Sequence, residues 1–154
     1  MDKLVALVNT ERIKFLRDDL APAVVDIITA QRDRNEADAA HRLAKIEWQR
    51  ATDQASEVES EVALVATIAG RIDGKNEAAR ALQLSGVLRE SDAVVAARAA
   101  TAKALQALAS AETTLNEAQA TYDANVNNFK ATLAAAALET ALLGALASLT
   151  REVI

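Results

Sequence analysis

Residues 70–91 read GRIDGKNEAARALQLSGVLRES and contain three of the four glycines in the chain. The long segments on either side are rich in alanine, the residue with the highest helix propensity. This distribution predicts an all-α fold, a long antiparallel helical hairpin with a short helix in its turn region. We expect one domain over residues 1–154, with a first arm at about 3–70, a turn at 70–90 and a second arm at about 91–151.

Residues that commonly cap helices divide the turn region. Gly70 is expected to close the first arm, because glycine readily adopts the left-handed conformation that follows a helix. Asn76 is expected to cap a short helix over residues 77–84, which Ser85-Gly86 would end. Ser91 is then the expected cap of the second arm.

The only proline, Pro22, interrupts the first arm. Because proline lacks an N–H group and crowds the preceding turn, it either kinks one continuous helix or begins a separate one. The kink is favoured, since residues 1–70 then match residues 87–154 in length. A kinked arm also predicts packing of the N-terminal segment along the end of the second arm. The residues expected in that contact are Phe15, Leu16, Leu142, Leu143 and Leu146.

The chain has a formal net charge of −5 at pH 7, a pI near 4.9 and no cysteine. The acidic balance argues against nucleic-acid binding, which requires a surplus of lysine and arginine. Without cysteine the chain has no disulfide framework and no thiol nucleophile. The N-terminal residues Met1 to Leu4 lack the features of a cleaved leader, so we expect an unprocessed, cytoplasmic protein.

Apolar residues recur at steps of three and four along both arms, which is the spacing of a coiled-coil seam. Each series contains one extra step of four, a stutter that locally relaxes the supercoil. Antiparallel pairing across the turn predicts that the numbers of facing residues sum to about 160. The first seam consists of Ala37, Ala40, Ala44, Trp48, Ala51, Ala55, Val58, Val62, Val65 and Ala69. The second seam consists of Leu108, Ala111, Leu115, Ala118, Tyr122, Val126, Phe129, Leu133 and Ala136.

The second arm carries few charges for a helix with one buried face. Residues 92–150 include eight charged side chains, although a hairpin helix is expected to keep most of its remaining surface polar. A second stripe of alanine and leucine runs beside the seam of this arm. Another copy of the chain would cover this second stripe, so we expect a homo-oligomer, a dimer or larger, assembled as a helical bundle. The second stripe consists of Leu105, Ala109, Ala120, Ala124, Ala131, Leu138 and Leu142.

No arrangement of reactive side chains indicates an enzyme. The single histidine, His41, follows the seam residue Ala40 and is expected on the charged outer surface, outside any metal site. Glu57, Glu59 and Glu61 alternate at a spacing of two, which points them in different directions on a helix, so we expect them to be solvated. We therefore expect no catalysis, no cofactor and no bound metal.

Residues 131–149 form the one segment that could be mistaken for a membrane span. Its length is just sufficient to cross a bilayer, but alanine is weakly hydrophobic and Glu139 lies in its middle. Packing inside a helical bundle is the favoured interpretation. A membrane-inserting or pore-forming helix is the alternative.

The turn sequence Ile72-Asp73-Gly74-Lys75-Asn76-Glu77 is followed by Arg80 and then by a long helix rich in alanine, glutamate and leucine. It resembles the turn of small coiled-coil proteins encoded by phages and prophages, which share a Gly-Lys-Asn-Glu-x-x-Arg motif between two helices. The resemblance covers about residues 35–140 and implies a helical hairpin without an assigned activity. Some proteins of this group are encoded near recombination genes.

The leading hypothesis from these patterns is a non-catalytic helical assembly, scaffold or interaction protein of phage-related origin. One alternative is a membrane-active protein that uses residues 131–149. A second alternative is a binding module whose polar tip recognises a protein or an anion. The tip residues are Arg71, Asp73, Lys75, Asn76 and Arg80.

Overall fold

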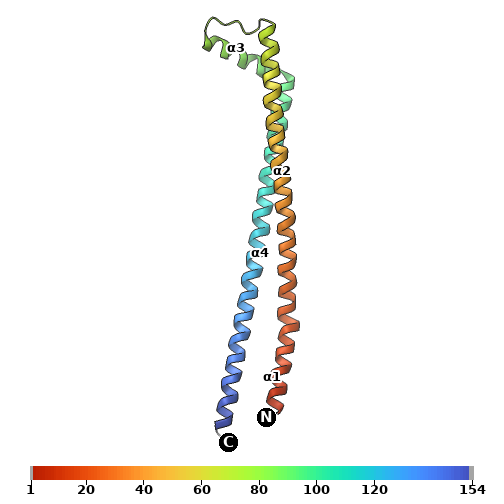
Figure 1. Cartoon of the computed structure of the whole chain (residues 1–154), viewed down its shortest axis with the longest axis vertical. Coiled ribbons are helices and arrows are strands. Elements are labelled where there is room, and N and C mark those ends of the chain that lie inside the picture. Colours follow the sequence, from red (N-terminus) through yellow and green to blue (C-terminus); the bar gives the residue numbers. More distant parts are fainter. Residues whose placement is uncertain (1, 153–154) are drawn as a thin grey trace. The chain divides into compact units, whose positions relative to one another are not determined.

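The computed structural model describes the backbone of residues 2–152 and the side chains of residues 6–145 and Ser148. Over these residues the chain is all-helical and contains no strand, which confirms the expected all-α helical hairpin (Figure 1). The helices are α1 (Asp2–Phe15), the π-helical turn η1 (Leu16–Leu20), α2 (Ala21–Ile68), α3 (Glu77–Glu90) and α4 (Asp92–Glu152).

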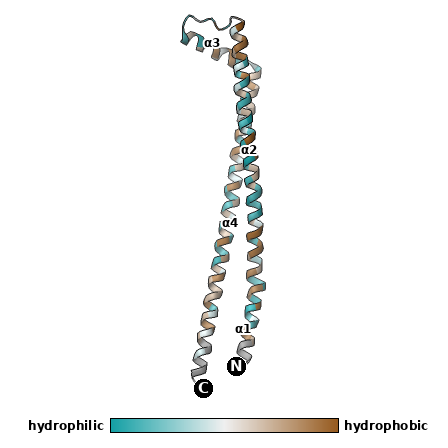
Figure 2. Ribbon diagram, in the orientation of Figure 1, coloured by the Kyte–Doolittle hydropathy of each residue, from teal (hydrophilic) through white to brown (hydrophobic). Residues whose placement is uncertain are grey.

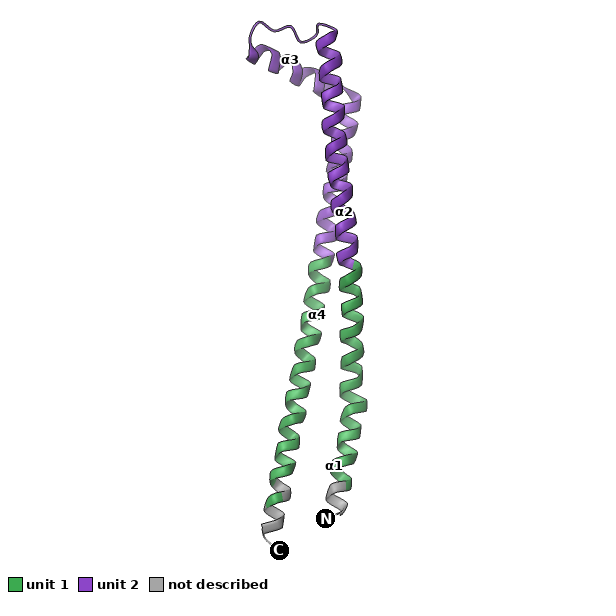
Figure 3. Ribbon diagram, in the orientation of Figure 1, with its two compact units in different colours: residues 1–36, 115–154 green, residues 37–114 purple. Residues whose placement is uncertain are grey.

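The chain divides into two compact units, each of which contains parts of both long helices (Figure 3). Unit 1 combines residues 1–36 with residues 115–154, and unit 2 consists of residues 37–114. In unit 1 the α1, η1 and α2 segments lie beside the C-terminal part of α4. Unit 2 contains the remainder of α2, the whole of α3 and the beginning of α4, and so includes the turn region of the hairpin.

Helices α1, η1 and α2 follow one another without a break, so the chain does not reverse at Pro22. The π-helical turn lies directly before the proline, and the Ala21 N–H donates to the Leu16 carbonyl oxygen, five residues back. This wider turn accommodates the crowding that a proline ring imposes on the turn before it. Within the π turn, the Arg17 side chain donates to Asp18 at 2.7 Å and lowers the pKa of that exposed carboxyl group.

The expected contact between the N-terminal segment and the end of α4 is only partly correct. Phe15 and Leu143 line one cleft of about 260 Å³ in unit 1. Leu16 and Leu142, however, are 52% and 58% exposed and do not belong to the buried contact. Leu146 lies outside the side chains that the structure describes.

The buried and half-buried side chains of η1 and α2 include one series at alternating steps of three and four, with no stutter over most of its length. The expected stutter at Trp48 is wrong, because the half-buried His41 occupies the seam position and Ala40 is exposed. The one departure comes at the end of α2, where Ala66 is buried and Val65 is 65% exposed. The series is Leu20, Ala23, Ile27, Ala30, Arg34, Ala37, His41, Ala44, Trp48, Ala51, Ala55, Val58 and Val62.

Helix α4 has a matching series, also without the expected stutter. Asn125 and Thr132 occupy its seam positions, whereas Leu133, which the apolar pattern placed there, is 41% exposed. Apolar spacing alone misses such positions because polar side chains fill them. The series is Val94, Ala97, Thr101, Ala104, Leu108, Ala111, Leu115, Ala118, Tyr122, Asn125, Phe129, Thr132 and Ala136.

Two polar side chains on the seam of unit 1, Arg34 and Asn125, contact the opposite helix. The Arg34 guanidinium lies 4.7 Å from the centroid of the Tyr122 ring, within the range of a cation–π contact. The Asn125 amide donates to the main-chain oxygen of Asp26 at 3.2 Å. These contacts let polar residues occupy the interface without leaving a buried group unpaired.

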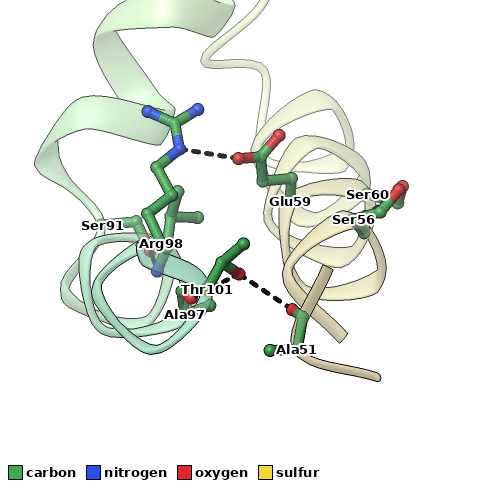
Figure 4. A network of polar contacts seen from close by, with 9 residues as sticks. Ala51, Ser56, Glu59, Ser60, Ser91, Ala97, Arg98 and Thr101 are labelled. Carbon is green, nitrogen blue, oxygen red and sulfur yellow. Dashed lines mark hydrogen bonds and ion pairs between the residues drawn. The ribbon is translucent and has the colours of Figure 1, made fainter. Parts of the chain in front are cut away.

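Alanine alternates with larger residues along most of both series, which allows the helix backbones to approach closely. In unit 2 the Thr101 hydroxyl donates at 3.0 Å to the main-chain oxygen of Ala51 on α2 and bonds the Ala97 oxygen of its own helix at 3.1 Å (Figure 4). A short side chain reaches the main chain of the neighbouring helix only when the two backbones are close. Small side chains thus determine the separation of the pair.

The register differs from the sequence expectation. The hydrogen bonds from Thr101 to Ala51 and from Asn125 to Asp26 join residues whose numbers sum to 152 and 151. The contacts of the longer side chains, between Arg34 and Tyr122 and between Arg98 and Glu59, join residues whose numbers sum to 156 and 157, so all four sums lie below the expected value of about 160. The reason is that the C-terminal part of α3 covers the end of α2, where Val87 is buried near Ala66. Helix α4 consequently begins beside Val62 rather than beside the last residue of α2.

The core is small and consists of short side chains. Among the described residues, those classed as buried are six alanines and valines, and none is polar or charged. The C-terminal half of α4 is coloured mostly white and brown in Figure 2, which marks weakly polar and apolar residues. The buried residues are Ala30, Ala37, Ala55, Ala66, Val87 and Val94.

Candidate functional site

The turn region of unit 2 begins with a closed helix C-terminus. Gly70 has a φ of 69°, and its N–H donates to the Thr67 oxygen at 3.1 Å. The next N–H, that of Arg71, donates to the Ala66 oxygen at 2.9 Å. This pair of bonds is the Schellman arrangement, which requires a left-handed residue after the helix and therefore favours glycine. The expected role of Gly70 is confirmed.

Gln83 organises the loop that follows. Its side-chain oxygen accepts the N–H groups of Asp73 at 3.1 Å and Gly74 at 2.9 Å, and its amide nitrogen donates to the Asp73 carboxylate at 3.0 Å. One side chain on α3 therefore satisfies three polar groups of the loop. Sequence reasoning missed Gln83, because an amide ten residues from its partner carries no local motif.

Asn76 begins α3 as expected, since its side-chain oxygen accepts the Ala79 N–H at 2.8 Å. The expected end of this helix is wrong: α3 continues through Ser85-Gly86 to Glu90. A glycine within a helix costs only about 1 kcal/mol relative to alanine, and the burial of Val87 favours continuation. Ser91 then caps α4, with its hydroxyl 3.5 Å from the Val94 nitrogen.

The tip residues take different roles in this structure. Arg71 lies 3.8 Å from Glu90 in an ion pair, Asp73 is held by Gln83, and Asn76 caps α3. The Asp73 carboxylate accepts its hydrogen bond from the Gln83 amide, at 3.0 Å. Lys75 and Arg80 remain exposed, so they are the tip residues available for contact with a partner.

Two open clefts flank the end of α2. The first, of about 530 Å³, has apolar walls that include Val62, Val65 and Val87, with the Arg71–Glu90 ion pair at its edge. The second, of about 500 Å³, lies on the α3 side. Large apolar side chains are also exposed on α2 and α3: Leu64 is 61% exposed, Ile68 is 78% exposed and Leu82 is 75% exposed. The second cleft is lined by Ala63, Thr67, Ile72, Glu77, Arg80, Ala81 and Leu84.

All seven residues of the second stripe are exposed. Its leucines, Leu105, Leu138 and Leu142, have 51%, 65% and 58% of their surface accessible. Leu105 and Ala109 belong to unit 2, and the other five belong to unit 1. The structure therefore provides no intramolecular cover for the stripe in either unit.

His41 and Glu59, which were considered as possible reactive residues, both lie between the two long helices or bond across them. His41 is half-buried on the α2 seam, which corrects its expected place on the outer surface. Glu59 is not simply solvated, because it accepts a hydrogen bond from Arg98 of α4 at 2.7 Å (Figure 4). Over the described part of the chain, no three histidine, cysteine or acidic residues gather into a potential metal site.

A search of the helices over the described residues finds no apolar stretch long enough to cross a membrane. The segment 131–149 includes three residues whose side chains are outside the description: Leu146, Ala147 and Leu149. Comparison of the chain with protein-family models, with curated proteins and with solved structures gives no match. The resemblance to phage-encoded coiled-coil proteins therefore stays a prediction.

Replacing Gln83 by alanine tests the organisation of the loop. The variant leaves the N–H groups of Asp73 and Gly74 without their protein acceptor, so we expect a loss of about 1–3 kcal/mol in the free energy of unfolding. Urea unfolding followed by circular dichroism measures this loss. Ser85→Ala, on the same helix, removes only a local bond to Leu82 and serves as the control. Equal stability of the two variants would contradict the role of Gln83.

Proposed function

We propose that this chain is a non-catalytic helical assembly protein that acts by associating with further copies of itself. The observation that carries this proposal is the exposure of the second stripe in both units, where Leu105, Leu138 and Leu142 have 51%, 65% and 58% of their surface accessible. Association with other chains would cover these apolar side chains.

The distribution of apolar residues supports the same proposal. The side chains that are buried among the described residues are alanines and valines, which bury little area each, while Leu105, Leu138 and Leu142 lie on the surface. Contiguous apolar patches larger than a few hundred Å² are uncommon on monomers and mark interaction surfaces. The resemblance of the turn to phage and prophage coiled-coil proteins supports a phage-related origin.

Thermal unfolding at different protein concentrations tests the proposal. Because self-association stabilises only the folded chain, the midpoint temperature should rise between about 2 µM and about 200 µM protein. A midpoint that is independent of concentration would contradict assembly. In that case the exposed leucines would need another role, and the membrane-active alternative through residues 131–149 would be tested by liposome flotation and dye release.

A binding module acting through the tip is the second candidate. It is favoured by one observation: the loop is fixed by Gln83, while the side chains of Lys75 and Arg80 remain exposed. A partner bound by these cations should be lost from pull-downs with the double variant Lys75→Glu and Arg80→Glu. The matched control is Lys45→Glu with Arg50→Glu, which makes the same charge change at exposed positions of α2. Unchanged partners in both variants would remove this candidate.

A further inference from the structure

We propose that two copies of the chain pair antiparallel along one face of α4, about a two-fold axis that passes beside Ala131. This inference rests on the proposed self-association and specifies the surface and geometry. The surface, here called the outer face, lies within unit 1 and points away from the α2 seam. It consists of Ala120, Thr121, Ala124, Asn127, Asn128, Ala131, Ala134, Ala135, Leu138, Ala141, Leu142 and Ala145.

The outer face is exposed and carries no charge. Every one of its residues is classed as exposed, which shows that α2 does not cover it. The only charged residues between positions 118 and 145 are Asp123, Lys130 and Glu139. None of them belongs to the outer face when positions are assigned from the α4 seam. A helix surface of this length without charge is unusual for contact with water alone.

The large and small residues of the outer face are arranged symmetrically about Ala131. Leu138 and Ala124 lie seven positions on either side of it, and Leu142 and Ala120 lie eleven positions on either side. An antiparallel pair centred on Ala131 therefore places each leucine of one copy opposite an alanine of the other. Facing large and small residues interdigitate and keep the separation of the helices uniform.

A parallel pair of the same faces packs less evenly. It would bring Leu138 against Leu138 and Leu142 against Leu142, which hold the helices apart at one end. It would also bring Ala120 against Ala120 and Ala124 against Ala124, which fill the space only when the helices are closer. The antiparallel arrangement avoids this mismatch and also aligns the helix dipoles favourably.

A second copy suits the outer face because alanine-rich helices of this chain already pack closely with one another. The hydrogen bond from Thr101 to the main chain of Ala51 shows the short separation that such a pair reaches within unit 2. The symmetric spacing about Ala131 also creates a self-complementary surface, as a two-fold interface requires. Lys130 of each copy would lie at the margin near the axis, where its flexible stem keeps the ammonium group in water.

Cysteine crosslinking tests the geometry directly, since the natural chain has no cysteine. Ala131→Cys should form a disulfide-linked dimer under mild oxidation, because the two-fold axis brings both copies of the residue together. Ala124→Cys alone should not crosslink, but a mixture of Ala124→Cys and Leu138→Cys chains should form the mixed dimer. Ala137→Cys, exposed on the same helix outside the outer face, is the control and should form no disulfide-linked dimer under the same oxidation.

The failures of this inference and of the proposed function are distinguishable. Self-crosslinking of Ala124→Cys would indicate a parallel pair and overturn the antiparallel geometry. Absence of any crosslink at Ala131, in a protein that sedimentation shows to be oligomeric, would place the interface on another surface. It would overturn this inference while leaving self-association intact. A chain that sediments as a monomer would overturn both.

Discussion

Gly74→Ala should destabilise the chain, and Gly86→Ala should stabilise it. A methyl group added at Gly74 would lie 2.7 Å from the Arg80 nitrogen, 2.8 Å from the Ala79 carbonyl carbon and 2.9 Å from the Ala79 Cβ. These are backbone and near-backbone atoms of α3 that cannot move aside cheaply. The loop or the first turn of α3 must shift, so we expect a loss of about 1–3 kcal/mol in the free energy of unfolding.

The control is Gly86, a glycine with open space around the position of an added methyl group. Gly86 lies inside α3, and a methyl group there would meet no atom within 4 Å other than those of its chain neighbours and of the adjacent helix backbone. Alanine at this position should raise the free energy of unfolding by about 1 kcal/mol, because it is the better helix former. Gly144→Ala in α4 is a second control with the same expectation. Urea unfolding measures all three variants, and a Gly74→Ala chain as stable as the natural one would disprove the close approach.

The double variant Leu138→Glu with Leu142→Glu should weaken self-association strongly. Each leucine is more than half exposed in the single chain, so its replacement should leave the monomer folded. In the assembly each leucine contributes about 1.5–3 kcal/mol if fully buried, and a buried carboxylate adds a further desolvation cost. We therefore expect the dissociation constant to rise by at least about 100-fold.

A charge-matched control separates the loss of the two leucines from the effect of added negative charge. Gln31→Glu with Gln49→Glu adds the same charge at exposed positions of α2. This control should retain the dissociation constant of the natural chain, measured for all proteins by dilution in analytical ultracentrifugation. Equal weakening in both variants would mean that net charge, and not the loss of Leu138 and Leu142, disrupts the assembly.

The fold class and the local turn signals could be predicted from the sequence because both depend on neighbouring residues. Gly70, Asn76 and Ser91 act through bonds to residues within five positions, so their roles are readable from residue type. The end of α3 could not be predicted from the local sequence. Burial of Val87 against α2 outweighs the weak helix propensity of Gly86, and burial depends on tertiary packing.

The seam positions could also be predicted only in part from the sequence. Periodicity identified a coiled-coil pattern, but it followed apolar residues and so inserted stutters around His41 and Asn125. Asn125 holds its seam position through a hydrogen bond to the main-chain oxygen of Asp26, and His41 is half-buried at its seam position. The register was missed because α3 covers the end of α2. Helix α4 begins at the expected residue but beside Val62, which the pattern of a single helix does not contain.

The candidate site could be predicted from the sequence only in part. The sequence singled out the tip residues, but it gave no sign that Gln83 would organise the loop or that Leu82 would be exposed. The second stripe was visible as a low-charge pattern on the second arm, and its exposure follows from the small area that two helices can cover. Self-association of this stripe stays a proposal, because a single chain does not contain the surface that would cover it.

Sedimentation equilibrium of the natural chain at micromolar concentration tests the central claim most directly. The account predicts a mass of at least twice the 16.3 kDa of one chain, decreasing toward that value on dilution. It also predicts that the Leu138→Glu, Leu142→Glu chain stays at the monomer mass under the same conditions. A natural chain that sediments as a 16.3 kDa monomer throughout the micromolar range would contradict self-association as its function.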